Sequence, residues 1–149
     1  MYKKVILPTD GSELSMKGVE EGLKAAKIYE IPALAVYVIS PGVVSLDQIG
    51  HRMEEFGHAT YSILRDQMKE RGEKILEKIK KKGTKTGVEV KTKLLEGIPY
   101  EEISKVAGKD DIIYICSHGR SGFTSLFLGS TTSRVIKHTN ATVAVVKAD

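Results

Sequence analysis

Glycines and hydroxyl side chains gather in one part of the sequence, after the apolar run Ile112–Cys116. They form the segments Ser117–Gly122 (SHGRSG) and Gly129–Thr132 (GSTT). Glycines let a backbone approach phosphate oxygens, and Ser130 opens a predicted helix whose first N–H groups lack partners within the helix. Arg120 adds a fixed positive charge. These residues predict a phosphate-binding loop, although a connecting loop with an ordinary helix cap would explain them equally well.

An acidic residue follows another apolar run. Asp10 comes two residues after the run Val5–Pro8 and two residues before the predicted helix 12–30. A carboxylate at the end of a strand can accept hydrogen bonds from ribose hydroxyls, as in dinucleotide-binding folds. Capping of the following helix is the alternative, and for Asp10 taken alone it is the favoured interpretation.

The motifs of several other chemistries are missing from the sequence. It has no G-x-G-x-x-G after the first apolar run, no G-x-x-x-x-G-K-[ST] and no G-x-S-x-G. His51 and His58 would lie about 10 Å apart along a helix, too far to share a metal ion, and neither His118 nor His138 has partners at ligand spacing. Cys116 near His118 could suggest a nucleophile, but a lone cysteine closing an apolar run is interpreted as a buried core residue. We therefore predict no catalytic residue and no metal site.

Apolar runs alternate with helical patterns along the chain, and this alternation predicts the elements that position the residues above. The expected strands are Val5–Pro8, Ala33–Ile39, Val88–Leu95, Ile112–Cys116 and Thr142–Val146, and the expected helices span 12–30, 51–82, 98–107 and 130–139. The alternating charges of Val88–Leu95 indicate an edge strand, whereas continuous runs such as Val143–Val146 indicate strands covered on both faces. The order predicts an α/β protein, one domain over 1–149, with a doubly wound parallel sheet and helices on both faces. Ligands bind such sheets at the carboxyl ends of the strands.

Composition excludes several classes of protein. The chain has 149 residues, 41% of them hydrophobic, with one cysteine and a net charge of +4. No apolar run reaches the roughly 18 residues of a membrane helix, and the short apolar N-terminus does not resemble a signal peptide, so we expect a soluble cytoplasmic protein. Seven lysines and one acid lie in residues 78–93. Because no aromatic residues are interleaved among them, this patch is interpreted as a solvated surface and nucleic acid is not an expected partner.

Motifs along the whole chain resemble those of one family. The chain opens with Lys4–Ser12 (KVILPTDGS), a Gly97-Ile98-Pro99 turn follows the third expected strand, and Ser117–Gly122 is followed by Leu128-Gly129-Ser130. This combination resembles the universal stress protein A family. The resemblance implies a five-stranded parallel sheet in the order 3-2-1-4-5 and a homodimer formed through the last strand, Thr142–Val146.

The same resemblance implies a nucleotide site. The ATP-binding branch of the family has the pattern G-x2-G-x9-G-[ST]; Gly119, Gly129 and Ser130 match it, while Cys116 replaces the first glycine. Pro8, Thr9 and Asp10 would border adenine and ribose, and Val38 would contact the base with Gly97 beside it. The residues implied around the phosphates are Cys116, Ser117, Gly119, Arg120, Gly129, Ser130 and Thr131.

Three functions are compatible with these residues. The first is a regulatory protein that binds ATP, with or without Mg²⁺, as a switch in a stress response and acts on unidentified protein partners. The second, suggested by Cys116, is a dimeric interaction protein that binds no nucleotide. The third is slow ATP hydrolysis, with Arg120 stabilising charge. The phosphate segment holds no carboxylate to orient an attacking water, which favours binding over fast hydrolysis.

Overall fold

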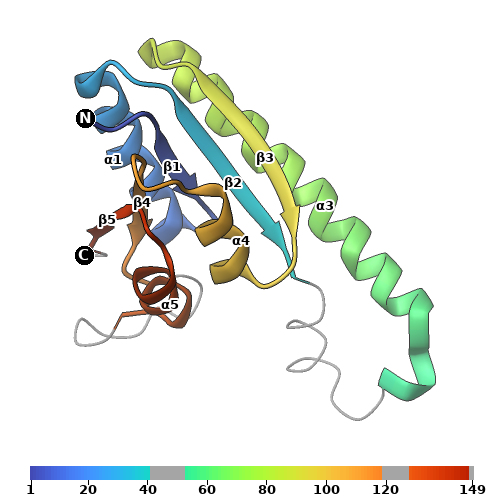
Figure 1. Ribbon diagram of the computed structural model, residues 1–149. Coiled ribbons are helices and arrows are strands. Elements are labelled where there is room, and N and C mark those ends of the chain that lie inside the picture. Colours follow the sequence, from blue (N-terminus) through green and yellow to red (C-terminus); the bar gives the residue numbers. More distant parts are fainter. Residues whose placement is uncertain (41–52, 119–127, 148–149) are drawn as a thin grey trace.

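A five-stranded sheet organises the protein (Figure 1). The computed structural model describes residues 1–40, 53–118 and 128–147, and of residues 53–59 only the backbone. The strands are β1 (Val5–Pro8), β2 (Ala33–Ile39), β3 (Val90–Glu96), β4 (Ile112–Cys116) and β5 (Thr142–Val146). All pair in parallel, in the order β3-β2-β1-β4-β5. The predicted fold class and strand order are confirmed, and the order reverses between β1 and β4.

Helices connect the strands and cover both faces of the sheet. They are α1 (Glu13–Tyr29), α3 (Met53–Thr86), α4 (Pro99–Val106) and α5 (Ser130–His138). The predicted cap of α1 is confirmed, since the Ser12 side chain accepts a hydrogen bond from the Ser15 N–H at 3.1 Å. Helix α3 runs further than predicted and ends just before Gly87, whose φ of +80° breaks the helical backbone.

Two apolar layers form the core, one on each face of the sheet. The layer under α1 and α3 contains Val5, Leu7 and Tyr37, and the layer under α4 and α5 contains Ile6, Val36 and Val135. Adjacent residues of a strand therefore point to opposite layers, which is why β1 and β4 read as continuous apolar runs. None of the helices in the described ranges is long and apolar enough to span a membrane.

The two edges of the sheet differ in composition. Strand β3 is an edge, as predicted, and Lys91, Thr92 and Lys93 are exposed on it. Strand β5 lies at the opposite edge, as the order 3-2-1-4-5 implied, and its last four residues are half-buried. Ala144 packs against the layer under α1 and α3, and Val143 and Val145 pack against the layer under α4 and α5, so both faces are partly covered. An apolar edge strand reads like a central strand in sequence, since composition does not reveal how many neighbours a strand has.

Candidate functional site

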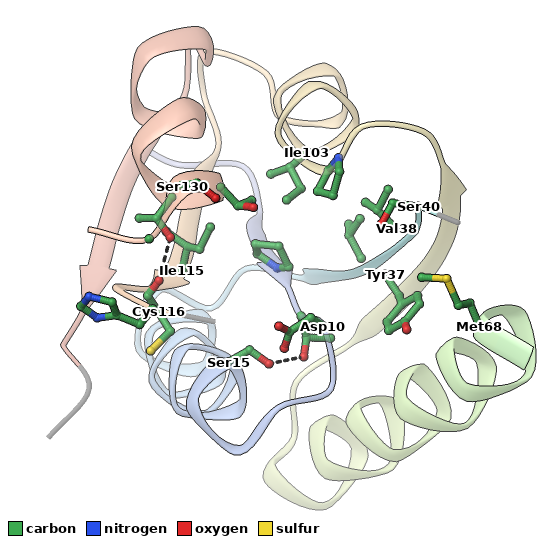
Figure 2. Close-up of a pocket in the computed structure, with 18 residues that line it drawn as sticks. Asp10, Ser15, Tyr37, Val38, Ser40, Met68, Ile103, Ile115, Cys116 and Ser130 are labelled. Atoms are coloured by element: carbon green, nitrogen blue, oxygen red, sulfur yellow. Dashed lines mark hydrogen bonds between the residues drawn. The ribbon is translucent and has the colours of Figure 1, made fainter. Parts of the chain in front are cut away.

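A cavity of about 390 Å³ opens at the carboxyl ends of β1, β2 and β4 (Figure 2). This is the point where the strand order reverses, so the loops after β1 and β4 diverge and leave a crevice between them. The volume is in the ordinary range for a small-molecule site. The cavity therefore lies where a doubly wound sheet is expected to bind its ligand.

The loop after β1 forms the floor of the cavity. Thr9 Oγ1 is hydrogen-bonded to Ser15 Oγ at 2.7 Å and accepts the Gly11 N–H at 3.0 Å. Asp10 Oδ1 accepts the Ser12 N–H at 2.9 Å. The Asp10 carboxylate thus helps to shape the start of α1 while the residue also lines the cavity, so the capping role and the binding role are compatible.

One wall of the cavity is mostly apolar. Val38 and Ser40 come from the end of β2, Met68 from α3, and Ile103 from α4. Figure 2 shows Met68 and Tyr37 on the side of α3, across the cavity from Ser130 and Cys116. Flat aromatic groups bind well to apolar walls of this kind. We call this set of residues (Val38, Ser40, Met68, Ile103) the apolar wall.

An ion pair joins α3 to the end of β3 beside the apolar wall. Arg65 Nε lies 2.8 and 3.0 Å from the two carboxylate oxygens of Glu96, at the end of β3. The hydrogen bond from Arg65 holds the pKa of the Glu96 carboxyl below its usual value, and the same pair raises the pKa of Arg65. Arg65 precedes Met68 by one helical turn, so the pair lies next to the part of α3 that reaches the cavity.

The opposite wall is polar and is built from β4 and α5. Its described residues are Cys116, His118, Gly129, Ser130, Thr131 and Thr132, which we call the polar wall. The N-cap residue of α5 is Gly129, which has no side chain to cap the helix, and the first turn of α5 has no acidic residue. Its first N–H groups and the positive end of its dipole therefore remain suited to an anion.

The thiol of Cys116 lies away from the first turn of α5. Figure 2 shows the sulfur directed toward α1, on the side of Ser15, with Ser130 on the other side of the strand. Helix α1 approaches closely here, since a Cβ added at Gly18 would lie 3.0 Å from the Cys116 nitrogen. The residue that replaces the first glycine of the pattern therefore turns its side chain into the α1 layer, where it is 4% exposed.

The polar wall also contains a buried histidine. His118 is 7% exposed, and its Nδ1 lies 3.0 Å from Ser117 Oγ. Its Nε2 is buried without a hydrogen-bond partner in the described part of the chain. A buried ring nitrogen is normally satisfied by protein, ligand or water. Within the described ranges, no cluster of three or more metal-ligating side chains exists.

The structure gathers most of the predicted site residues. Pro8, Thr9, Asp10, Val38, Cys116, Gly129, Ser130 and Thr131 line the cavity. Ser117 and Gly97 are not among the lining residues: the carbonyl of Ser117 accepts the Gly129 N–H, and the N–H of Gly97 donates to the Ile39 carbonyl. Gly119 and Arg120 lie outside the described residues.

Sequence reasoning missed part of the lining. Met68 and Ile103 carry no local signal, because each is one apolar position of an amphipathic helix. Thr132 stands in the GSTT segment, and its place in the run of hydroxyl residues could have indicated it.

The fold and cavity together define an α/β protein with a ligand crevice at the switch point of its sheet. The family model described as the universal stress protein family matches residues 1–147, so the chain belongs to that family. Universal stress protein MJ0531 of Methanocaldococcus jannaschii is 34% identical over 99% of this chain and 83% of its own length. Universal stress protein MJ0577 of the same organism is 35% identical over 99% of this chain and 96% of its own length.

Solved structures share the fold. A structure of MJ0577 has a TM-score of 0.78 at 34% identity and covers 100% of this chain and 98% of that one. A universal stress protein in complex with cAMP has a TM-score of 0.66 at 18% identity and covers 98% and 97% of the two chains. A universal stress protein from Archaeoglobus fulgidus in complex with dAMP has a TM-score of 0.60 at 18% identity and covers 99% and 98%.

Proposed function

We propose that this universal stress protein binds ATP, or a related adenine nucleotide, in the cavity and acts in the cytoplasm as a nucleotide-dependent switch in a stress response. The observation that carries the proposal is the contrast between the two walls of one cavity. The apolar wall suits a base, and the polar wall suits phosphates, because it presents the uncapped start of α5.

The individual residues support this orientation of a nucleotide. Asp10, the only acidic residue lining the cavity within the described ranges, lies on the floor between the walls, where its carboxylate would accept hydrogen bonds from a ribose. Ser130 and Thr131 line the cavity, and their hydroxyls would donate hydrogen bonds to the phosphates. Mg²⁺ would accompany the triphosphate as part of the ligand.

The position of Cys116 favours nucleotide binding over the alternative without a nucleotide. The alternative rests on the thiol filling the space that glycine leaves in the family pattern. Since the sulfur lies in the α1 layer, the first turn of α5 keeps its access to the cavity. Related folds whose structures contain cAMP and dAMP support an adenine nucleotide as the ligand class.

Isothermal titration tests the proposal directly. We expect heat on titrating ATP with Mg²⁺ into the protein, and competition by AMP for the same site. GTP should bind more weakly if the apolar wall selects the base. Absence of heat with every adenine nucleotide at millimolar concentration would refute nucleotide binding.

We further propose that two copies of the chain pair through β5. The supporting observation is an apolar edge strand that is only half-buried, which leaves main-chain groups and valine side chains available to a second copy. Sedimentation equilibrium should show a dimer at micromolar concentration. A monomer at every concentration would contradict this pairing.

A further inference from the structure

The two halves of the polar wall come from opposite ends of one segment. Cys116 and His118 precede residues 119–127, and Gly129 to Thr132 follow them. A nucleotide phosphate would need both halves at a fixed separation. The contacts that hold the start of α5 against the end of β4 therefore set this separation.

Two hydrogen bonds join these halves. The Gly129 N–H donates to the Ser117 carbonyl at 2.7 Å, and the Thr132 hydroxyl donates to the Cys116 carbonyl at 2.8 Å. The first bond uses main-chain atoms only, so nearly any residue at these positions could form it. The second depends on the hydroxyl of Thr132, which makes it the contact that the sequence specifies.

Burial makes the Thr132 contact strong and its loss costly. Thr132 is 4% exposed and Cys116 is also 4% exposed, so water does not readily replace either partner. Removing the hydroxyl would leave the Cys116 carbonyl without this donor in a buried setting. Apolar packing holds α5 one turn later, at Val135, but such packing is non-directional and does not fix how the first turn is oriented.

The hydroxyl also has a defined task that is separate from ligand contact. Its single hydrogen is used on the Cys116 carbonyl, so it is not available to donate to a phosphate. The amides of the first turn of α5 are the groups that would contact the anion, and the Thr132 side chain sets their position.

We propose that Thr132 is a positioning residue for the phosphates: its buried bond to the Cys116 carbonyl holds the first turn of α5 in the orientation that binds a nucleotide's anionic tail. This inference rests on the proposed nucleotide function. It separates Thr132 from the neighbouring Ser130 and Thr131, which would contact the ligand themselves. Adenosine, which lacks the tail, should not depend on this bond.

The test compares Thr132→Val, which keeps the shape and loses the hydroxyl, with Thr132→Ser, which keeps the hydroxyl. Thr139→Val is the matched control, because Thr139 Oγ1 accepts the Ala141 N–H at the other end of α5, away from the cavity. Adenosine and ATP with Mg²⁺ are titrated into each full-length variant. We expect Thr132→Val to bind ATP about ten-fold more weakly while adenosine changes by less than about two-fold. Thr132→Ser and Thr139→Val should bind both ligands like the original chain.

Unchanged ATP binding by Thr132→Val overturns the inference, as does an equal loss for adenosine and ATP or a failure of serine to preserve binding. If Thr132→Val does not fold, Thr132→Ala against Thr132→Ser repeats the comparison, since these two differ only in the hydroxyl. If the original chain binds neither ligand, the proposed function fails and the inference fails with it. If the original chain binds ATP and Thr132→Val binds it equally well, the inference alone fails and the proposed function stands.

Discussion

The two walls of the cavity are assembled in different ways. The polar wall comes from a short stretch of chain between the end of β4 and the first turn of α5, whereas the apolar wall combines side chains from β2, α3 and α4. Hydrogen bonds from backbone amides and hydroxyls depend on the direction of the donor, so the polar wall needs a particular local geometry. The apolar wall needs only shape and apolar surface, which many elements can supply. A ligand that bridges the walls should therefore respond to substitutions on each in distinct ways.

The largest expected effect comes from filling the backbone position that opens α5. Gly129→Val would place a side chain where a phosphate approaches the main chain, and hydrogen bonds to charged groups contribute about 1.5–3 kcal/mol each. We expect ATP to bind roughly a hundred-fold more weakly, with adenosine changed far less. Isothermal titration of both ligands measures the difference.

A matched glycine serves as control for that substitution. Gly108 is exposed and lies outside the cavity, and a Cβ there would meet its nearest neighbour, Asp111, at an ordinary 3.5 Å. Gly108→Val should leave both affinities unchanged. If Gly129→Val weakened the binding of adenosine and of ATP equally, the assignment of the phosphates to the polar wall would be wrong.

Substitutions in the apolar wall should weaken the binding of adenosine and of ATP equally. Met68→Ala removes a half-buried thioether from the cavity, and we expect adenosine and ATP to bind about ten-fold more weakly to the same extent, because both carry the base. Ile63→Ala, on the same helix but 57% exposed, should have no effect. A loss confined to ATP would contradict the assignment of the base to this wall.

The floor between the walls offers a finer test. Asp10→Asn keeps a side-chain oxygen that can accept the Ser12 N–H, but removes the charge that would favour ribose hydroxyls. We expect about five-fold weaker binding of ATP, and no change for 2′,3′-dideoxy-ATP, which lacks those hydroxyls. Titration of both nucleotides into the original chain and the variant gives the comparison; a similar loss for both analogues would mean that Asp10 acts only on the loop.

The smallest expected effect concerns the ion pair beside the apolar wall. The pKa of Glu96 is lowered in the folded protein, so its contribution to stability is present above its unfolded pKa and is lost as the pH falls through the folded value. Glu96→Gln should therefore lower the melting temperature slightly near neutral pH and have no effect in acid, below the lowered pKa. Because both side chains are exposed, the effect should also shrink in high salt. A difference in melting temperature that persists in acid would exclude this ion pair as its source.

Sequence and structure contributed unequally to the two walls. The GSTT segment and Asp10 could be named as candidates in advance, because glycine, hydroxyl and acidic residues at strand ends form a local pattern, although turns and helix caps use the same residue types. Met68 could not be identified in advance, because it lines the cavity together with residues that are distant in the chain. Methionine is also a common residue in any apolar core. The direction of the Cys116 side chain could not be predicted from the sequence either, because it depends on which face of β4 packs against α1.

The sequence alone determined the order of strands and helices, the parallel sheet with its alternating layers, and the segment that forms the polar wall. These follow from periodicity and from local backbone chemistry, which act over a few residues. Only the tertiary structure decided how far β5 is buried, that α3 supplies part of the apolar wall, and that Thr132 joins α5 to β4. Those features depend on packing between elements far apart in the chain, and no local pattern records how such elements meet.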